Sequence, residues 1–147
     1  MRVAGRVLGV VLVMLAGAGG CSNELHGALE ATLRAGGGKQ WSTTPSECAS
    51  GERQGFFGVD MRAGGSDDTL VRAILDPKDG PILKLNVPGT DQGVTVKPGP
   101  GCSRFDVQVE RQSSRINNIT NVRGHVRVTC DDPELALTAD ITFENCH

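Results

Sequence analysis

The sequence predicts an all-β fold, an antiparallel β-sandwich of about seven strands, over residues 48–147. Short apolar runs recur at close spacing, and turn-forming residues separate them, as in Asp76-Pro77-Lys78-Asp79-Gly80. Near the end of the chain, apolar and polar residues alternate, which places one face of each strand in a core and the other in water. The expected strands cover residues 56–61, 70–75, 82–87, 94–96, 105–109, 122–130 and 135–143.

The last three expected strands indicate which side chains face the core. Phe105, Val107 and Val109 alternate with polar residues, and the same pattern continues through 126–130 and 135–143. We expect these strands to pair as an antiparallel meander. Charged residues of both signs lie on the opposite face, where we expect cross-strand ion pairs among Asp106, Glu110, Arg123, Arg127, Asp140 and Glu144.

One short helix is expected ahead of the sandwich, over residues 22–34. Leu25, Leu29 and Leu33 repeat every four residues, a spacing typical of one helix face, and glycines end the pattern. Two interpretations stay open for this helix: it packs on the domain or frays as part of a tether, or it lies on a membrane. The following residues 36–45 have the composition of a linker.

The beginning of the chain has the three parts of a secretory signal peptide. Arg2 and Arg6 supply positive charge, an apolar run covers residues 7–16, and small residues lead into Cys21. The apolar run is too short to span a bilayer core of about 30 Å. A cysteine directly after small residues resembles the lipobox of bacterial lipoproteins, and this resemblance implies that Cys21 carries lipid and becomes the mature N-terminus. The alternative is ordinary cleavage near residues 16–18, which would leave Cys21 as a free or paired thiol.

These features divide the chain into three parts. A lipoprotein signal peptide covers 1–20, the lipidated Cys21 with the helix and a Gly-rich linker covers 21–47, and a disulfide-bonded domain covers 48–147. Removing the first part takes two of the 15 basic side chains and leaves 13 against 17 acidic ones. Because this balance is mildly acidic and no basic stripe remains, we expect no nucleic-acid partner.

A second resemblance covers the region from Cys48 to Cys146. Its motifs are a cysteine ahead of the strand at 56–61, then Ala73-Ile74-Leu75-Asp76, Gly93-Val94-Thr95-Val96 and Ile141-Thr142-Phe143-Glu144-Asn145-Cys146. This arrangement resembles small bacterial envelope lipoproteins of the mycobacterial surface-antigen type. The closing residues 118–147 are also similar to small lipoproteins of predatory and soil-dwelling Gram-negative bacteria. Neither resemblance brings a catalytic residue with it.

Four cysteines follow Cys21, and three pairings of them are possible. The resemblance implies a bridge between Cys48 and Cys146, which leaves Cys102 with Cys130. Strand geometry agrees with the second pair, because Cys102 begins one strand and Cys130 ends its antiparallel neighbour. In the alternation pattern, Cys102 falls on an outward-facing position and Cys130 on an inward-facing one. This pair therefore requires a bulge or bend near Gly101.

We expect no catalytic, cofactor or metal site. His125 with Asp131 or Asp132 and Ser113 could be written as a triad, but no nucleophile elbow or characteristic spacing supports it. The cysteines lack the close pairs of a zinc site. The acidic turns at 67–68, 76–79 and 131–132 match no EF-hand loop, so capping of backbone groups is favoured there over calcium binding.

The signal peptide and the lack of a recognisable active site together indicate a non-enzymatic, lipid-anchored cell-envelope lipoprotein that acts as a binding or accessory module. Its expected partners are the membrane, through Cys21, and an unidentified envelope protein, glycan or lipid. The alternative is a carrier of lipid or of a small ligand, with a pocket inside the sandwich. Ser22 after the cysteine resembles an outer-membrane sorting pattern, so we expect the outer membrane if the envelope has two membranes.

Overall fold

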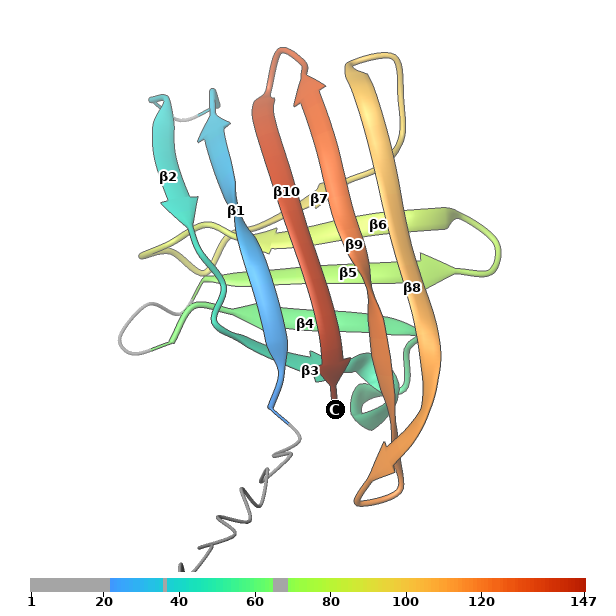
Figure 1. Ribbon diagram of the computed structural model, residues 1–147. Coiled ribbons are helices and arrows are strands. Elements are labelled where there is room, and N and C mark those ends of the chain that lie inside the picture. The colour runs from blue at the N-terminus through green and yellow to red at the C-terminus, as the bar shows by residue number, and fades with distance from the viewer. Residues whose placement is uncertain (1–21, 36, 65–68) are drawn as a thin grey trace, which may run out of the picture.

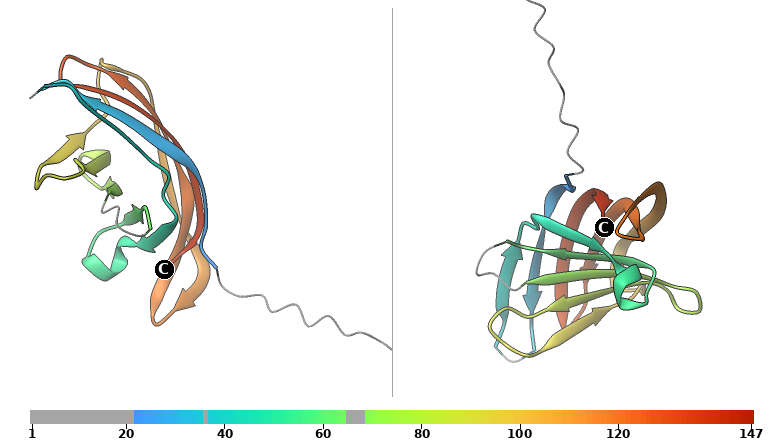
Figure 2. Two further views of the ribbon diagram at one scale, coloured as in Figure 1. Left: turned by 90° about the vertical axis from the view of Figure 1, so that its left-hand side faces the viewer. Right: turned by 90° about the horizontal axis from the view of Figure 1, so that it is seen from below.

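A computed structural model describes residues 22–35, 37–64 and 69–147 and is all-β, with two antiparallel five-stranded sheets (Figure 1). Sheet A has the strand order β2-β1-β10-β9-β8, and sheet B has the order β3-β4-β5-β6-β7. The strands of sheet A run across those of sheet B (Figure 1). Sheet A is curved, and sheet B lies on its concave side (Figure 2). The fold is therefore a two-sheet sandwich, as the sequence predicts.

The strands of sheet A come from both ends of the chain: β1 (Glu24–Leu33), β2 (Lys39–Thr43), β8 (Cys102–Ile116), β9 (Ile119–Asp131) and β10 (Leu135–Cys146). Sheet B is one continuous meander of β3 (Glu47–Ser50), β4 (Gly58–Arg62), β5 (Leu70–Asp76), β6 (Gly80–Asn86) and β7 (Gly93–Val96). A single 3₁₀ turn, η1 (Gly51–Gln54), follows β3 in the described part of the chain. The seven expected strands correspond to β4–β10, and β1, β2 and β3 are additional.

The predicted helix over 22–34 is wrong, because this stretch forms strand β1. β1 pairs with β10 from Glu24 opposite Glu144 to Leu33 opposite Leu135. A spacing of four residues is close to one helical turn but is also two full strand repeats. Leu29, Ala31 and Leu33 are accordingly buried on one side of the strand. Partnership with β10, at the opposite end of the chain, decides between the two structures.

The predicted Gly-rich linker is wrong for Lys39–Thr43, which form β2 beside β1. Trp41 of this strand lies opposite Ala31 and is only 8% exposed, so it belongs to the core. Gly37 and Gly38 lie between the two strands, and both have positive φ. The sandwich therefore begins at Glu24, ahead of the predicted boundary at residue 48.

The core fills the space between the two sheets, and the predicted alternation is confirmed. Val107, Val109, Val126 and Val128 are buried, whereas their polar neighbours face outward. Side chains from both sheets with no more than 2% exposure complete the interior: Leu29, Val59, Met61, Val71, Leu83, Leu85, Leu137, Ile141 and Phe143. Burial of this apolar surface is the main stabilising term of the fold.

The outer face of sheet A carries the predicted cross-strand ion pairs. Arg123 lies 3.2 Å from Glu110, and Arg127 lies 3.6 Å from Asp140. These side chains are largely exposed, so each pair contributes roughly 0–1 kcal/mol. The ion pairs on this outer face thus stabilise the sheet only slightly.

Two disulfides join the described strands. Cys48 and Cys146 link β3 to β10 and therefore connect the two sheets. Cys102 and Cys130 lie opposite each other on the neighbouring strands β8 and β9 of sheet A. The register shifts between Cys102 and Arg104, which supplies the bulge that this pair requires near Gly101. These are the pairs that the resemblance and the strand ends imply.

Candidate functional site

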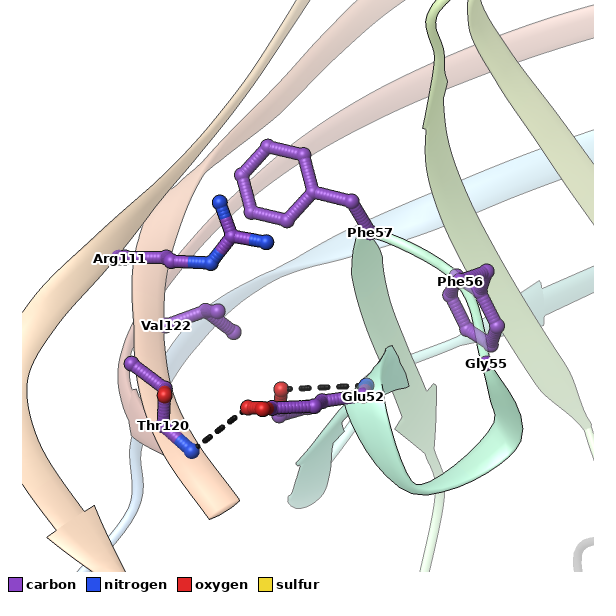
Figure 3. Close-up of a pocket in the computed structure, with 8 residues that line it drawn as sticks. Glu52, Gly55, Phe56, Phe57, Arg111, Thr120 and Val122 are labelled. Carbon is purple, nitrogen blue, oxygen red and sulfur yellow. Dashed lines mark hydrogen bonds between the residues drawn. The ribbon is translucent and has the colours of Figure 1, made fainter.

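An open cavity of about 240 Å³ lies at the end of the sandwich where η1 meets sheet A (Figure 3). Sheet B and η1 supply one wall, and β8 and β9 of sheet A supply the other. The lining residues are Ser50, Glu52, Gly55, Phe56, Phe57, Arg111, Thr120 and Val122. Strand β1 begins at this same end of the molecule (Figure 1).

The local sequence around η1 turns the chain back and places two phenyl rings beside the cavity. The Ser50 hydroxyl accepts the Glu52 N–H at 3.4 Å and caps the turn. Gly55 ends it in the left-handed region at φ 79°, which costs glycine little. Gly51 lets the Phe56 ring pack closely, since a Cβ there would lie 2.3 Å from that ring. Phe57 follows and reaches toward sheet A (Figure 3).

Arg111 occupies an unusual place on sheet A. It continues the inward-facing row of Phe105, Val107 and Val109, and it lies opposite the buried Val122. The register shifts directly after it, between Arg111 and Arg115, so Arg111 is the last inward position before an irregular stretch of β8. The guanidinium therefore lies at the open end of the sandwich instead of on the solvent-exposed outer face of sheet A.

The Arg111 guanidinium stacks on an aromatic ring. Its Cζ lies 4.4 Å from the centre of the Phe57 ring, a cation–π arrangement (Figure 3). Stacking uses the face of the guanidinium and leaves the N–H donors on its edges. Within the described residues, no hydrogen bond or salt bridge occupies these donors. They are available to a ligand in the cavity.

Glu52 closes the lower part of the cavity. Its Oε2 accepts the backbone N–H of Thr120 at 2.8 Å, which joins η1 to β9 (Figure 3). This hydrogen bond is the main reason that the pKa of Glu52 is lowered from its usual 4.5, and the charges of Arg115 and Arg111 lower the pKa further. Glu52 is therefore ionised at neutral pH, and the cavity contains one cation and one anion.

The neighbouring phenyl ring is fixed by a second arginine, on the other face of sheet B. The Cζ of Arg72 lies 4.7 Å from the Phe56 ring centre. The same guanidinium binds Asp60 through both carboxylate oxygens, at 2.6 and 2.7 Å, and also contacts Gln54 of η1. Hydrogen bonding to Asp60 raises the pKa of Arg72 above its usual range. Because Asp60 is 4% exposed, this network holds η1 firmly on the sheet.

The structure does not bring the candidate triad together. Nε2 of His125 lies 2.9 Å from Asp106, and this contact is the main reason that the pKa of Asp106 is lowered. Asp131 lies six residues further along β9, about 20 Å at strand spacing, and pairs with Arg34 instead. Ser113 lies in the irregular part of β8. Cys21 and the acidic pair at 67–68 lie outside the described residues.

The other acidic turns cap backbone groups. Asp76 accepts the N–H groups of Lys78 and Asp79 at 2.8 and 2.9 Å, and these bonds lower the pKa of Asp76. Asp132 accepts the N–H groups of the residues two and three positions further on. In the described ranges, no group of three or more His, Cys, Asp or Glu side chains is placed to hold a metal ion. Nor does any helix of those ranges have the length and apolar character needed to cross a membrane.

Sequence reasoning did not identify Glu52, Phe57 or Arg111 as site residues. One signal was available: in the alternation of β8, the cationic Arg111 falls on the same side of the strand as the buried Val107 and Val109. Nothing in the sequence indicates that Phe57, from the other sheet, covers it.

The fold and this end cavity define a two-sheet all-β sandwich with internal disulfides and an open hollow where η1 meets β8 and β9. No known protein family, curated protein or solved structure matches the chain.

Proposed function

We propose that this protein is an exported envelope lipoprotein, anchored by lipid on Cys21, whose sandwich is a non-enzymatic binding or accessory module. The observation that carries the proposal is the cysteine pairing. Bridges between Cys48 and Cys146 and between Cys102 and Cys130 use four of the five cysteines. Cys21 is left without a disulfide partner in its own chain, which suits a thioether-linked lipid. Disulfides also favour an oxidising, exported location.

The start of the domain supports a close attachment to the membrane. The Asn23 side chain donates a hydrogen bond to the carbonyl oxygen of Cys48 at 2.9 Å, and β1 begins at the next residue. Asn23 is two residues after Cys21, so a lipid there would be held within about 7 Å of this fixed point. The domain would rest against the membrane without a stalk, with the end cavity on the membrane side.

The alternative is a lipid or small-ligand carrier with a pocket inside the sandwich. Leu29, Met61, Val126 and Ile141 fill the space between the sheets and have no exposed surface. The hollow at the open end is smaller than the roughly 300 Å³ or more of typical ligand pockets. This packing supports the anchored module over a carrier of long acyl chains. Stoichiometric lipid in the purified protein, beyond a covalent anchor, would reverse this preference.

Metabolic labelling with an alkyne fatty acid in a bacterial host tests the anchor. We expect the full-length protein to incorporate the label and Cys21→Ser to lose it. A Cys102→Ser/Cys130→Ser double variant is the matched control, because it removes other cysteines but keeps the label. Unlabelled wild type, or a labelled Cys21→Ser variant, would refute the proposed anchor.

A further inference from the structure

We propose that the end cavity binds a carboxylate joined to a small apolar group, and that Arg111 is the residue that takes the carboxylate. The inference rests on the proposed binding role of the domain and names the ligand class for it. It does not depend on the lipid, because every residue that carries it lies in the sandwich.

Arg111 supplies the cation that an anionic ligand would contact. Arg111 is held by the Phe57 ring, yet its N–H donors have no partner among the described residues. A planar guanidinium with free edges matches the two oxygens of a carboxylate. Since the stacked ring already restricts the side chain, little conformational freedom is lost when the ligand binds.

The size and polarity of the cavity limit the rest of the ligand. Phe56, Phe57 and Val122 line the cavity with apolar surface beside the guanidinium. A volume of about 240 Å³ suits a group of the size of one amino-acid residue. An extended acyl chain does not fit, and a purely polar anion would leave the apolar lining of the cavity uncovered.

The charges around the cavity limit the charge of the ligand. Glu52 faces the same cavity in its ionised form, because Thr120 hydrogen-bonds to it. Arg115 and Arg111 both act electrostatically on Glu52, so two cations lie near one carboxylate and leave one net positive charge. A monoanion neutralises this charge, whereas a dianion such as phosphate would leave an excess of negative charge beside Glu52. The site therefore prefers monoanions.

Two sources could supply this chemistry: a free short-chain acid, or the C-terminal carboxylate of a peptide whose chain leaves through the open side. The probes N-acetyl-alanine and N-acetyl-tetra-alanine represent them. N-acetyl-alanine methyl ester removes the charge, and inorganic phosphate, at a pH above its second pKa, replaces the monoanion with a largely dianionic group.

Titration of the ¹⁵N-labelled full-length protein in nonionic detergent tests the inference. We expect one or both acids to shift the amide signals of Gly55, Phe57, Thr120 and Val122. The ester and phosphate should bind at least about tenfold more weakly. Tighter binding of the peptide would assign the chain terminus as the source, and equal binding would assign the free acid.

Variants assign the role of Arg111. Arg111→Ala should weaken binding by at least about tenfold, the loss expected when a charged hydrogen-bond donor is removed. Arg123→Ala, an exposed arginine on the outer face of the same sheet, should bind like wild type. An unchanged wild-type spectrum at high probe concentration would overturn the inference, as would equal binding by the ester or by Arg111→Ala. If the protein is lipidated but binds neither acid, only this inference fails; if it binds an acid but carries no lipid, only the anchor fails.

Discussion

The Arg111 guanidinium of sheet A lies 4.4 Å from the centre of the Phe57 ring, which directly precedes strand β4 of sheet B. The preceding residue, Phe56, is covered in turn by Arg72 of sheet B itself, at 4.7 Å. Two successive phenyl rings are thus each held by an arginine, one from each sheet. The turn after η1 therefore connects the two sheets through these stacked pairs. The cavity lies on the side where the N–H donors of Arg111 have no partner among the described residues.

The contact between Arg111 and Phe57 should show a measurable coupling energy. In a double-mutant cycle of Arg111→Met and Phe57→Leu, we expect roughly 0.5–1 kcal/mol of coupling in the free energy of unfolding, because the pair is a partly exposed cation–π contact. Denaturant unfolding of the four proteins measures it. Additive effects of the two substitutions would show that the stacking adds nothing.

Breaking the hydrogen-bond network around Asp60 should destabilise the fold far more than breaking an ion pair on the solvent-exposed outer face of sheet A. Arg72→Met leaves the buried Asp60 without its cation and should destabilise the fold by about 3–5 kcal/mol. Arg123→Met breaks an exposed pair with Glu110 and should cost less than about 1 kcal/mol. Urea unfolding of both variants makes the comparison, and similar losses would contradict the described burial of Asp60.

Glu52 should contribute to the acid dependence of stability. Its pKa is lowered in the folded protein, mainly by the Thr120 N–H, so its stabilisation is complete above the usual pKa of 4.5 and is lost as pH falls through the folded pKa. Glu52→Gln should therefore be less stable than wild type at pH 7, and the difference should shrink below pH 4.5. Thermal melts across this range measure the difference, and a constant gap would mean that Glu52 does not titrate differently in the two states.

The two disulfides should contribute unequally. The chain-entropy relation gives about 5 kcal/mol for Cys48–Cys146, which spans 98 residues, and about 4 kcal/mol for Cys102–Cys130, which spans 28. The first bridge also connects the sheets, whereas the second links strands that are already paired. Cys48→Ser/Cys146→Ser should thus have the lower melting temperature. The reverse order would show that strain or residual structure outweighs loop length.

Most of the fold could be predicted because its signals are local. The strands β4–β10 follow from apolar runs separated by turn residues, and the inward row of β8 and β9 follows from alternation. Strand β1 could not be predicted in this way. Leu25, Leu29 and Leu33 fit a helix face and a strand face equally well, and only the pairing with β10 separates the two.

The site was harder to predict because it combines distant segments. The disulfide pairs follow from strand ends and from a resemblance, but the cavity depends on Phe57 meeting Arg111 from another sheet. The one local indication of the site was that Arg111 falls on the core-facing side of β8 in the alternation pattern. Its meaning depends on η1 and the residues after it reaching β8 and β9 at that point, which no local pattern specifies.

The most direct test of the account is the intact mass of the protein extracted from its own membranes, after free thiols are alkylated without reduction. We expect a chain that begins at Cys21, carries an acylglyceryl group, and has no alkylated cysteine because the other four are bridged. Cleavage near residues 16–18, with one alkylated thiol or a dimer through Cys21, would contradict it.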